Sequence, residues 1–483
     1  MKKSIRLITL CITLLFFTIT TFGQDKAKQI EQLLNKYTEY GQFNGSALVA
    51  ENGKVIFKKG FGSANFEWNI PNQPDTKFRL GSITKQFTAL LVVKLAEEGK
   101  IKLDVPITTY LPDYPKENGD KITIHNLLTH TSGIPNYTAS PNFLKEKSRN
   151  PYTPEAFVKT FSSLPLEFTP GEKFNYSNSG YFLLGYIIEK ITGKSYEQYL
   201  QETILTPLKM VNTGFDHSEI IIKNRAAGYE KEGKVLSNAS FIDMSIPYAA
   251  GSLYSTVEDL YLWDQALYTN KLLSEKSMEL LFKPYIKAWD DSYGYGWSIE
   301  EVLIGDKKLK IIEHGGGING FNTIISRIPA DKVLVVLLNN TGGTVLGEMN
   351  NSIRSILYKQ PYEQPKKSMA LDLLDVYSTK GVAAGNEMYK KLKNDPTYGI
   401  KEGDMNRVGY QLLQTGKKKE AIEVFKINTE TFPKSGNTYD SLGEAYLADG
   451  NKKLAIENYT KSVELDPSNE GGKKVLAELQ KGK

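Results

Sequence analysis

Strand-forming patterns lie at both ends of the first 360 residues, and a long helical region separates them. Near the N-terminus, two β-prone runs at 45–50 and 55–58 flank an Asn-Gly pair, which is typical of a tight hairpin turn. The chain from 103 to about 285 shows mainly helical patterns. Further strands are predicted at Tyr295–Leu303, Leu309–Glu313, Phe321–Ile328 and Val333–Leu338. The sheet is complete only when these late strands join the early hairpin, which predicts an α+β domain.

Apolar residues at helical spacing mark 26–40 and 344–358, and we expect these two helices to cover one face of the sheet. A polar stretch with two prolines follows, and it predicts a linker over 361–370. The sequence therefore predicts a first domain over 24–360 and a second domain over 371–483.

A repeat of 34 residues occupies the C-terminal part of the chain. Small, aromatic and proline positions recur at this spacing, as Gly409, Ala421, Phe425 and Pro433 and then as Gly443, Ala455, Tyr459 and Pro467. The pattern resembles the tetratricopeptide repeat, a pair of antiparallel helices. The resemblance implies an all-α repeat domain, capped by a helix near 470–479. Such a domain would either bind a protein partner or only stabilise the first domain.

The first 23 residues are typical of a secretory signal peptide. Three cations precede the apolar run 7–19, and small residues lead to an expected cleavage site near Gly23. The apolar run is too short to span a bilayer, and no later stretch reads as a transmembrane helix. We therefore expect an exported protein, periplasmic or secreted.

The mature chain that this cleavage would leave has no cysteine, because Cys11 lies inside the leader. Disulfides, thiol nucleophiles and cysteine-bound metals are excluded for it. Removing the three leader cations takes the formal net charge from +5 to +2, so the charge does not indicate nucleic-acid binding.

Ser82 and Lys85 stand at the predicted start of an apolar helix. Residues three apart share one face of a helix, so the amine of Lys85 would lie beside the hydroxyl of Ser82. To accept the serine proton, the lysine must have its pKa lowered by roughly 3 units from about 10.4, which burial and a neighbouring cation can achieve. The alternative is structural, with Ser82 as a helix N-cap and Lys85 in solvent.

Two later fragments complete a candidate site. Tyr176 and Asn178 form a Tyr-Ser-Asn triplet, and His314 opens a glycine-rich turn that includes Gly316 and Gly317. Glycines at such a turn let a backbone edge approach a ligand closely. Ser-x-x-Lys, Tyr-Ser-Asn and His-x-Gly in this order resemble the serine β-lactamase and penicillin-binding-protein superfamily, in its class C-like branch. The resemblance covers about residues 28–358.

The resemblance implies a fold and a set of roles. The fold would be a β-lactamase/transpeptidase-like antiparallel sheet flanked by helices. Ser82 would form an acyl-enzyme, with Lys85 and Tyr176 sharing the proton transfers. Asn178 would hydrogen-bond Lys85 and the substrate amide. Backbone N–H groups of Ser82 and Gly317 would form the oxyanion hole. No cofactor and no metal are expected, since the remaining histidines lack ligand spacing.

His314 stands where the stricter β-lactamases of the superfamily carry a lysine. A histidine is only partly charged near neutrality, which favours peptidase or esterase chemistry over efficient β-lactam hydrolysis. We expect His314 to face the substrate; the alternative is a histidine whose partner is a neighbouring carboxylate such as Glu313.

Two functional hypotheses follow. The first is an exported serine hydrolase acting on D-amino-acid or cell-wall-type peptides or small esters. The second is a β-lactam-binding or sensing protein that turns over little and signals through its helical repeats.

Overall fold

A computed structural model describes residues 25–140, 143, 147–344 and 346–481 of the 483-residue chain. The predicted signal peptide lies outside the described residues. The chain divides into two compact units. The first runs to Lys231 and resumes over Leu236–Glu363, and the second comprises Glu232–Val235 and the chain from Gln364 onward. Each unit is described by itself.

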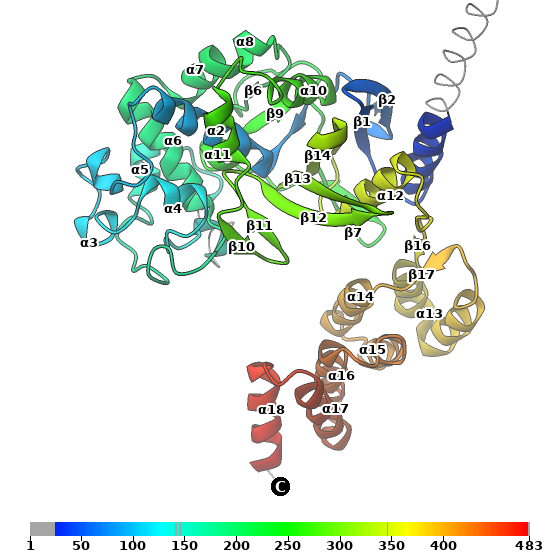
Figure 1. The fold of residues 1–483 in the computed structure, drawn as a ribbon. Coiled ribbons are helices and arrows are strands. Elements are labelled where there is room, and N and C mark those ends of the chain that lie inside the picture. Colours follow the sequence, from blue (N-terminus) through cyan, green and yellow to red (C-terminus); the bar gives the residue numbers. More distant parts are fainter. Residues whose placement is uncertain (1–24, 141–142, 144–146, 345, 482–483) are drawn as a thin grey trace, which may run out of the picture. The chain divides into compact units, whose positions relative to one another are not determined.

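An eight-stranded antiparallel sheet forms the centre of the first unit (Figure 1). Its order along the sheet is β10-β11-β12-β13-β14-β15-β1-β2. The strands are β1 (Gly45–Glu51), β2 (Lys54–Phe61), β10 (Ile286–Ala288), β11 (Asp291–Tyr293), β12 (Ser298–Ile304), β13 (Lys307–Ile318), β14 (Phe321–Ile328) and β15 (Val333–Asn339). The last strand β15 pairs with β1, with Ala47 opposite Leu337. This pairing confirms that the late strands join the early hairpin in one sheet.

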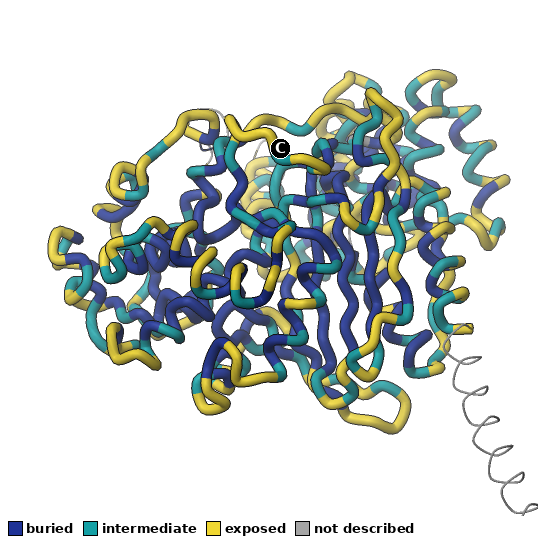
Figure 2. The backbone as a smooth tube through the Cα atoms, turned by 90° about the horizontal axis from the view of Figure 1, so that it is seen from above, coloured by how far each residue is buried: buried dark blue, intermediate teal, exposed yellow. Residues whose placement is uncertain are grey.

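The central strands are buried on both faces, and Figure 2 shows them dark blue along most of their length. Because side chains alternate across a strand, β15 contributes to two separate cores. Leu334 and Val336 belong to one core, and Val335 and Leu337 belong to the other. Each fully buried aliphatic side chain of this size contributes about 2 kcal/mol of stabilisation.

The second of these cores is covered by the two helices predicted to lie on one sheet face. They are the helical residues 25–39 and α12 (Gly347–Leu357), and their apolar side chains pack with Val335 and Leu337. The other core holds α2 (Thr84–Glu97), which is buried on nearly every side. The helix ends just before Gly99, which adopts φ +70°.

The region between the two sets of strands is mainly helical, as predicted, with short strands that the patterns did not indicate. Its helices are α3 (Lys116–Gly119), α4 (Ile124–Leu128), α5 (Pro154–Val158), α6 (Asn178–Thr192), α7 (Tyr196–Leu200), α8 (Thr206–Leu208), α9 (Tyr248–Gly251), α10 (Val257–Ala266) and α11 (Glu275–Leu281). The short strands are β3 (Ser63–Asn65), β4 (Ile70–Pro71), β5 (Phe78–Arg79), β6 (Gly214–Phe215), β7 (Tyr229–Glu232), β8 (Val235–Asn238) and β9 (Leu253–Ser255). Strands of two to four residues are too short to show a two-residue period.

The glycine-rich segment after His314 is extended, whereas the sequence predicted a turn. Strand β13 continues through Gly316 and Gly317 to Ile318, and the turn follows at Asn319-Gly320. The strand stays paired because Gly316 lies opposite Thr323 of β14. The predicted turn between the two strands is present but shorter than expected, and Gly316 and Gly317 lie in the strand, where they allow a close approach of two backbones.

The second unit is a stack of helix pairs. Helices α14 (Glu402–Gln414) and α15 (Lys418–Thr431) are repeated by α16 (Gly436–Ala448) and α17 (Lys452–Leu465), and α18 (Glu470–Lys481) follows them. At equivalent positions Gly409 lies against the ring of Phe425 and Gly443 lies against the ring of Tyr459. The predicted repeat and its terminal helix are confirmed.

An earlier helix, α13 (Met369–Leu392), precedes these pairs after the short strand β16 (Lys367–Ser368). It is broken at Gly381, whose φ is +79°, so it consists of two helices. Strand β16 pairs in parallel with β17 (Tyr398–Gly399). These two helices precede the first of the matching helix pairs in the chain.

Candidate active site

Ser82 lies in a short 3₁₀ turn, η1 (Gly81–Ile83), which leads directly into α2. The sequence predicted Ser82 in the first α-helical turn; the tighter turn arises because Gly81 has φ +56°. The backbone of Gly317 on β13 is so close that a Cβ atom on Gly81 would lie 2.9 Å from the nitrogen of Gly317. Thr323 fixes the same region from β14, since its hydroxyl donates to the carbonyl of Leu80 at 2.7 Å. The serine thus lies between the start of a helix and a sheet strand.

Lys85 is fully buried and contacts three oxygen atoms. Its Nζ lies 3.0 Å from Oγ of Ser82, 2.8 Å from Oδ1 of Asn178 and 2.8 Å from the carbonyl oxygen of Ala250. Burial holds the pKa of Lys85 well below that of an ordinary lysine. The alternative of a solvated lysine is excluded by this burial.

These contacts define the direction of the proton transfer. The oxygens of Asn178 and Ala250 can only accept hydrogen bonds, so a neutral amine donates its two N–H groups to them. Its remaining lone pair then faces the hydroxyl of Ser82. This is the arrangement that a general base requires.

Tyr176 and Asn178 approach the lysine from the segment that opens α6. Asn178 is the first residue of that helix, and its Nδ2 donates to Oγ1 of Thr138 at 3.1 Å, which fixes the amide orientation. The Nζ of Lys85 lies 4.9 Å from the centre of the Tyr176 ring. Burial raises the pKa of Tyr176, and the neighbouring hydroxyl of Ser82 opposes this rise. A neutral phenol is therefore favoured.

His314 is buried and is held by both of its ring nitrogens. Its Nδ1 lies 2.6 Å from the carbonyl oxygen of Gly315, which can only accept, so Nδ1 carries the proton. Its Nε2 accepts from the hydroxyl of Tyr293 at 2.9 Å. Burial, together with the Lys85 cation, lowers the pKa of His314 to about 4. The geometry does not support the expected substrate-facing role, because neither nitrogen is left for a substrate; nor is Glu313 its partner.

A hydrogen-bond chain continues from Tyr293 to the other side of the site. The Nε2 of His130 lies 3.3 Å from the hydroxyl of Tyr293, and Nδ1 of His130 accepts from the backbone N–H of Ser177 at 3.1 Å. The chain runs from Ser177 through His130, Tyr293 and His314 to Gly315, and we call it the histidine chain. It connects the segment of Tyr176 and Asn178 to the glycine segment of β13.

Three participants were not predicted from the sequence. His130, Tyr293 and Ala250 were not among the predicted site residues. His130 has φ +57° and its ring lies 4.2 Å from that of Tyr176, so it is a neighbour of the site rather than remote. The available signal was its position in the segment Leu-Thr-His-Thr-Ser-Gly, where a helix is followed closely by a glycine.

Gly316 and Gly317 lie beside the serine, as predicted, but they differ in what surrounds them. A Cβ atom on Gly316 would lie 1.9 Å from the carbonyl oxygen of Leu80, so only glycine fits there. On Gly317 it would meet only the Asn322 amide, at an ordinary 3.6 Å. Gly316 therefore sets the distance between β13 and the chain before Ser82.

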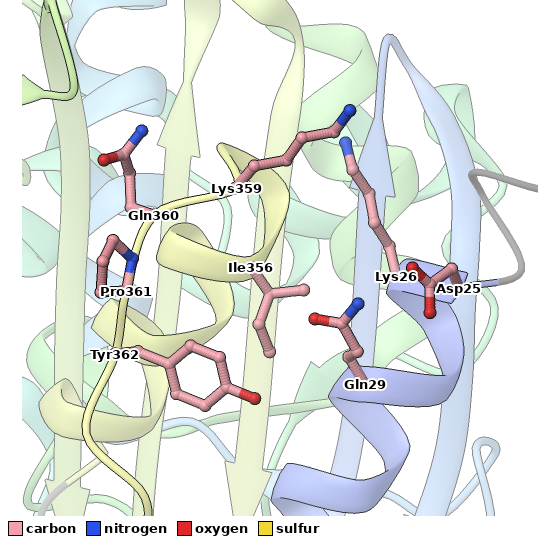
Figure 3. A pocket seen from close by; sticks show the side chains of 8 residues that line it. All are labelled: Asp25, Lys26, Gln29, Ile356, Lys359, Gln360, Pro361 and Tyr362. Carbon is pink, nitrogen blue, oxygen red and sulfur yellow. The ribbon is translucent and has the colours of Figure 1, made fainter.

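A pocket of about 450 Å³ lies elsewhere in this unit, between the helical residues 25–39 and the end of α12 (Figure 3). Asp25, Lys26 and Gln29 face Ile356 and Lys359 across it. None of the predicted site residues lines it. Within the described residues there is no group of three His, Cys, Asp or Glu side chains placed to hold a metal ion, and no helix long and apolar enough to cross a membrane.

Comparison with protein families shows the family of the first unit and of the repeats. Residues 29–357 match the Beta-lactamase family model, and residues 436–469 match a tetratricopeptide repeat model. A Bacillus subtilis (strain 168) protein named as penicillin-binding protein PbpX is 32% identical over 338 residues, which cover 70% of this chain and 81% of PbpX. Protein flp of Staphylococcus aureus (strain MW2) is 32% identical over 65% of this chain and 63% of its own length.

Solved structures share the fold of the first unit. The octameric penicillin-binding protein homologue from Pyrococcus abyssi matches with a TM-score of 0.62 and 31% identity, covering 72% of this chain and 81% of that one. D-amino acid amidase from Ochrobactrum anthropi SV3, in complex with L-phenylalanine amide, matches with a TM-score of 0.61 and 25% identity, covering 69% and 99%.

Proposed function

Because the chain belongs to the β-lactamase family of serine hydrolases, we propose that it cleaves an acyl donor through a covalent acyl-enzyme on Ser82. The observation that carries this proposal is the environment of Lys85. A fully buried amine with a lowered pKa has two N–H groups bound to fixed acceptors and its lone pair toward the Ser82 hydroxyl. A serine beside such a base is an activated nucleophile.

In the first step Oγ of Ser82 attacks the carbonyl carbon of the donor while its proton moves to Nζ of Lys85. The negative charge that develops on the carbonyl oxygen is stabilised by the backbone N–H groups of Ser82 and Gly317. The close approach of Gly81 and Gly317 supports this assignment, since it brings the two backbones together.

In the second step the tetrahedral intermediate collapses and the leaving group takes a proton from the hydroxyl of Tyr176. The raised pKa of Tyr176 keeps that proton available, and the Lys85 ammonium then returns a proton to the phenolate. Water repeats the sequence in the deacylation half, with Tyr176 and Lys85 removing its proton. Ser82, Lys85 and Tyr176 end in their starting states.

The substrate class we propose is D-amino-acid or cell-wall-type peptides or small esters. Within this class a neutral His314 favours D-aminoacyl amides and small esters, because it supplies no cation beside the nucleophile for a free carboxylate. Relatives named as penicillin-binding proteins and as D-amino acid amidase support the same range. We further propose that the protein is exported through its leader and that the helical repeats bind a protein partner.

The test combines turnover with mass spectrometry. Purified protein should hydrolyse at least one of three donors: a short-chain nitrophenyl ester, a D-aminoacyl amide or a D-Ala-D-Ala peptide. Intact mass after treatment with a fluorophosphonate should show one adduct on Ser82. The Ser82→Ala variant should lose both the adduct and the activity, by more than about a thousandfold in rate.

Two outcomes would contradict the hydrolase. If the wild-type protein shows neither turnover nor a Ser82 adduct, the hydrolase proposal is wrong. A lasting β-lactam adduct on Ser82 without turnover of any donor would favour the sensing protein instead.

The pH dependence of acylation tests the role of Lys85. The rate of Ser82 labelling should rise with pH as Lys85 loses its proton. Its midpoint should lie below the pKa of an ordinary lysine, about 10.4, because burial lowers the pKa of Lys85.

A further inference from the structure

Trp289 occupies a turn position that strongly disfavours a bulky side chain. Strands β10 and β11 are joined by Trp289 and Asp290 alone, because Ala288 pairs with Asp291. Trp289 has φ +52°, a conformation that two-residue hairpins usually assign to glycine, asparagine or aspartate. The local structure would be more stable with one of those residues.

The indole ring is also poorly buried, so packing does not explain its presence. Trp289 keeps 63% of its surface exposed. Its ring contacts two others, with centres 4.9 Å from Phe174 and 6.0 Å from Tyr176. A strained, exposed aromatic residue beside the proposed acid indicates a functional constraint on this position.

We propose that Trp289 determines specificity by stacking on an aromatic ring in the leaving group of the substrate. The inference rests on the proposed function, in which Tyr176 gives its proton to that leaving group. The interplanar angle between the Trp289 and Tyr176 rings is 36°, so the indole extends the aromatic surface of Tyr176 toward solvent. A ring attached to the leaving atom would lie against this surface, where offset stacking is favourable.

The charges beside the ring narrow the class of ligand. Asp290 directly follows Trp289 in the turn and is exposed, so one carboxylate lies next to the indole in the chain. The carboxylate of Asp291 is bound instead, because it accepts from the hydroxyl of Ser298 at 3.3 Å. An anionic substituent on the leaving group would be repelled there. The expected ligand is therefore an ester or amide with an uncharged or cationic aromatic leaving group.

The experiment uses full-length protein and three uncharged esters. Benzyl acetate carries the ring in the leaving group, ethyl phenylacetate carries it in the acyl group, and ethyl acetate has no ring. Trp289→Asn, which suits the left-handed turn, should lower kcat/KM for benzyl acetate about tenfold. The same variant should change kcat/KM for the other two esters less than about twofold. Trp289→Phe should restore most of the loss, because it keeps an aromatic face.

The thermal unfolding midpoint of Trp289→Asn should equal or exceed that of the wild type, since asparagine is better suited to this φ. Trp68→Asn serves as the matched control, because Trp68 is 77% exposed in the loop between β3 and β4. It should leave all three rates unchanged.

The outcomes distinguish a failure of the Trp289 inference from a failure of the proposed hydrolase function. An equal loss on all three esters, or a loss only on ethyl phenylacetate, would overturn the leaving-group assignment while the hydrolase stands. A lowered unfolding midpoint with unchanged ester ratios would make Trp289 a packing residue. No ester turnover and no Ser82 adduct in the wild type would overturn both.

Discussion

At the scale of single residues, the histidine chain determines which ring nitrogen of His314 and of His130 carries the proton. Gly315 fixes the proton of His314 on Nδ1, and the backbone N–H of Ser177 fixes that of His130 on Nε2. The hydroxyl of Tyr293 then has one arrangement, accepting from His130 and donating to His314. Both histidines stay neutral in it, and burial lowers the pKa of each.

Tyr293→Phe tests the histidine chain at its centre. The change leaves Nε2 of His314 buried without its donor, which should cost about 1–3 kcal/mol in the free energy of unfolding. The rate of Ser82 labelling should fall because the Tyr176 segment and the β13 segment lose their connection. Nitrogen-15 spectra of labelled histidine should show the Nδ1–H form of His314 in both proteins, because Gly315 still accepts from Nδ1. The Nε2 resonance of His314 should shift in the variant, where that nitrogen has lost its donor. A slower rate with an unchanged Nε2 resonance would contradict the positioning role.

The pKa of His314 also gives a pH-dependent stability with a defined sign. The folded-state pKa, about 4, is below the ordinary value of about 6.5, so acid protonates the unfolded state first. The stabilisation is complete above pH 6.5 and is lost as the pH falls toward 4, by up to about 3 kcal/mol. Urea unfolding at several pH values would measure it, together with a contribution of the same sign from His130, whose pKa burial also lowers.

Sequence motifs identified the residues proposed to carry the chemistry but not those that orient them. Ser82 and Lys85 are three residues apart, so helical geometry alone places them together. Tyr293 lies on β11 and reaches His130 only because the sheet brings that strand beside α4 and its following loop. No local pattern records such a contact.

At the scale of elements, the glycines of β13 set the width of the site. Gly316→Ala would place a methyl group 1.9 Å from the carbonyl oxygen of Leu80 and 2.3 Å from Oγ1 of Thr323. Neither atom can move freely, because Thr323 is bound to that same carbonyl. We expect a loss of about 2–4 kcal/mol in stability and displacement of η1 from β13.

Gly317→Ala is the matched control for this prediction. Its methyl group would meet only the amide of Asn322 at 3.6 Å, so packing alone should change stability by less than about 1 kcal/mol. Denaturant unfolding and the rate of Ser82 labelling would measure both variants. Equal stability of the two would show that β13 tolerates a wider separation from Leu80.

Long elements were predicted well, and short ones were not. The hairpin of β1 and β2 has an Asn-Gly turn, and β15 is an almost continuous apolar run, so local chemistry specifies them. β10 and β11 have three residues each and a turn with an unfavourable residue, Trp289. Tertiary contacts, rather than the strand or turn propensity of their residues, must stabilise such elements.

At the scale of the whole molecule, each unit has its own hydrophobic core. The two cores around the sheet contain only residues up to Tyr362, and the core of the repeats begins at Met369. A unit whose core is complete within its own chain segment can fold independently. The proposed domain division therefore leads to a prediction about truncation.

A chain that stops after Glu363 should keep the rate of Ser82 labelling within about twofold of the full-length rate. Calorimetry of the full chain should show two unfolding transitions, of which the truncated chain keeps one.

Gly409→Ala in the full chain identifies the transition that truncation removes, because its methyl group would lie 2.4 Å from the ring of Phe425. This variant should lower only the transition that truncation removes, by an amount typical of overpacking, about 1–3 kcal/mol. A single shared transition, or a truncated chain that no longer labels at Ser82, would mean that the hydrolase depends on its repeats for folding. The repeats would then stabilise the enzyme, and the proposal that they bind a partner would lose its structural basis.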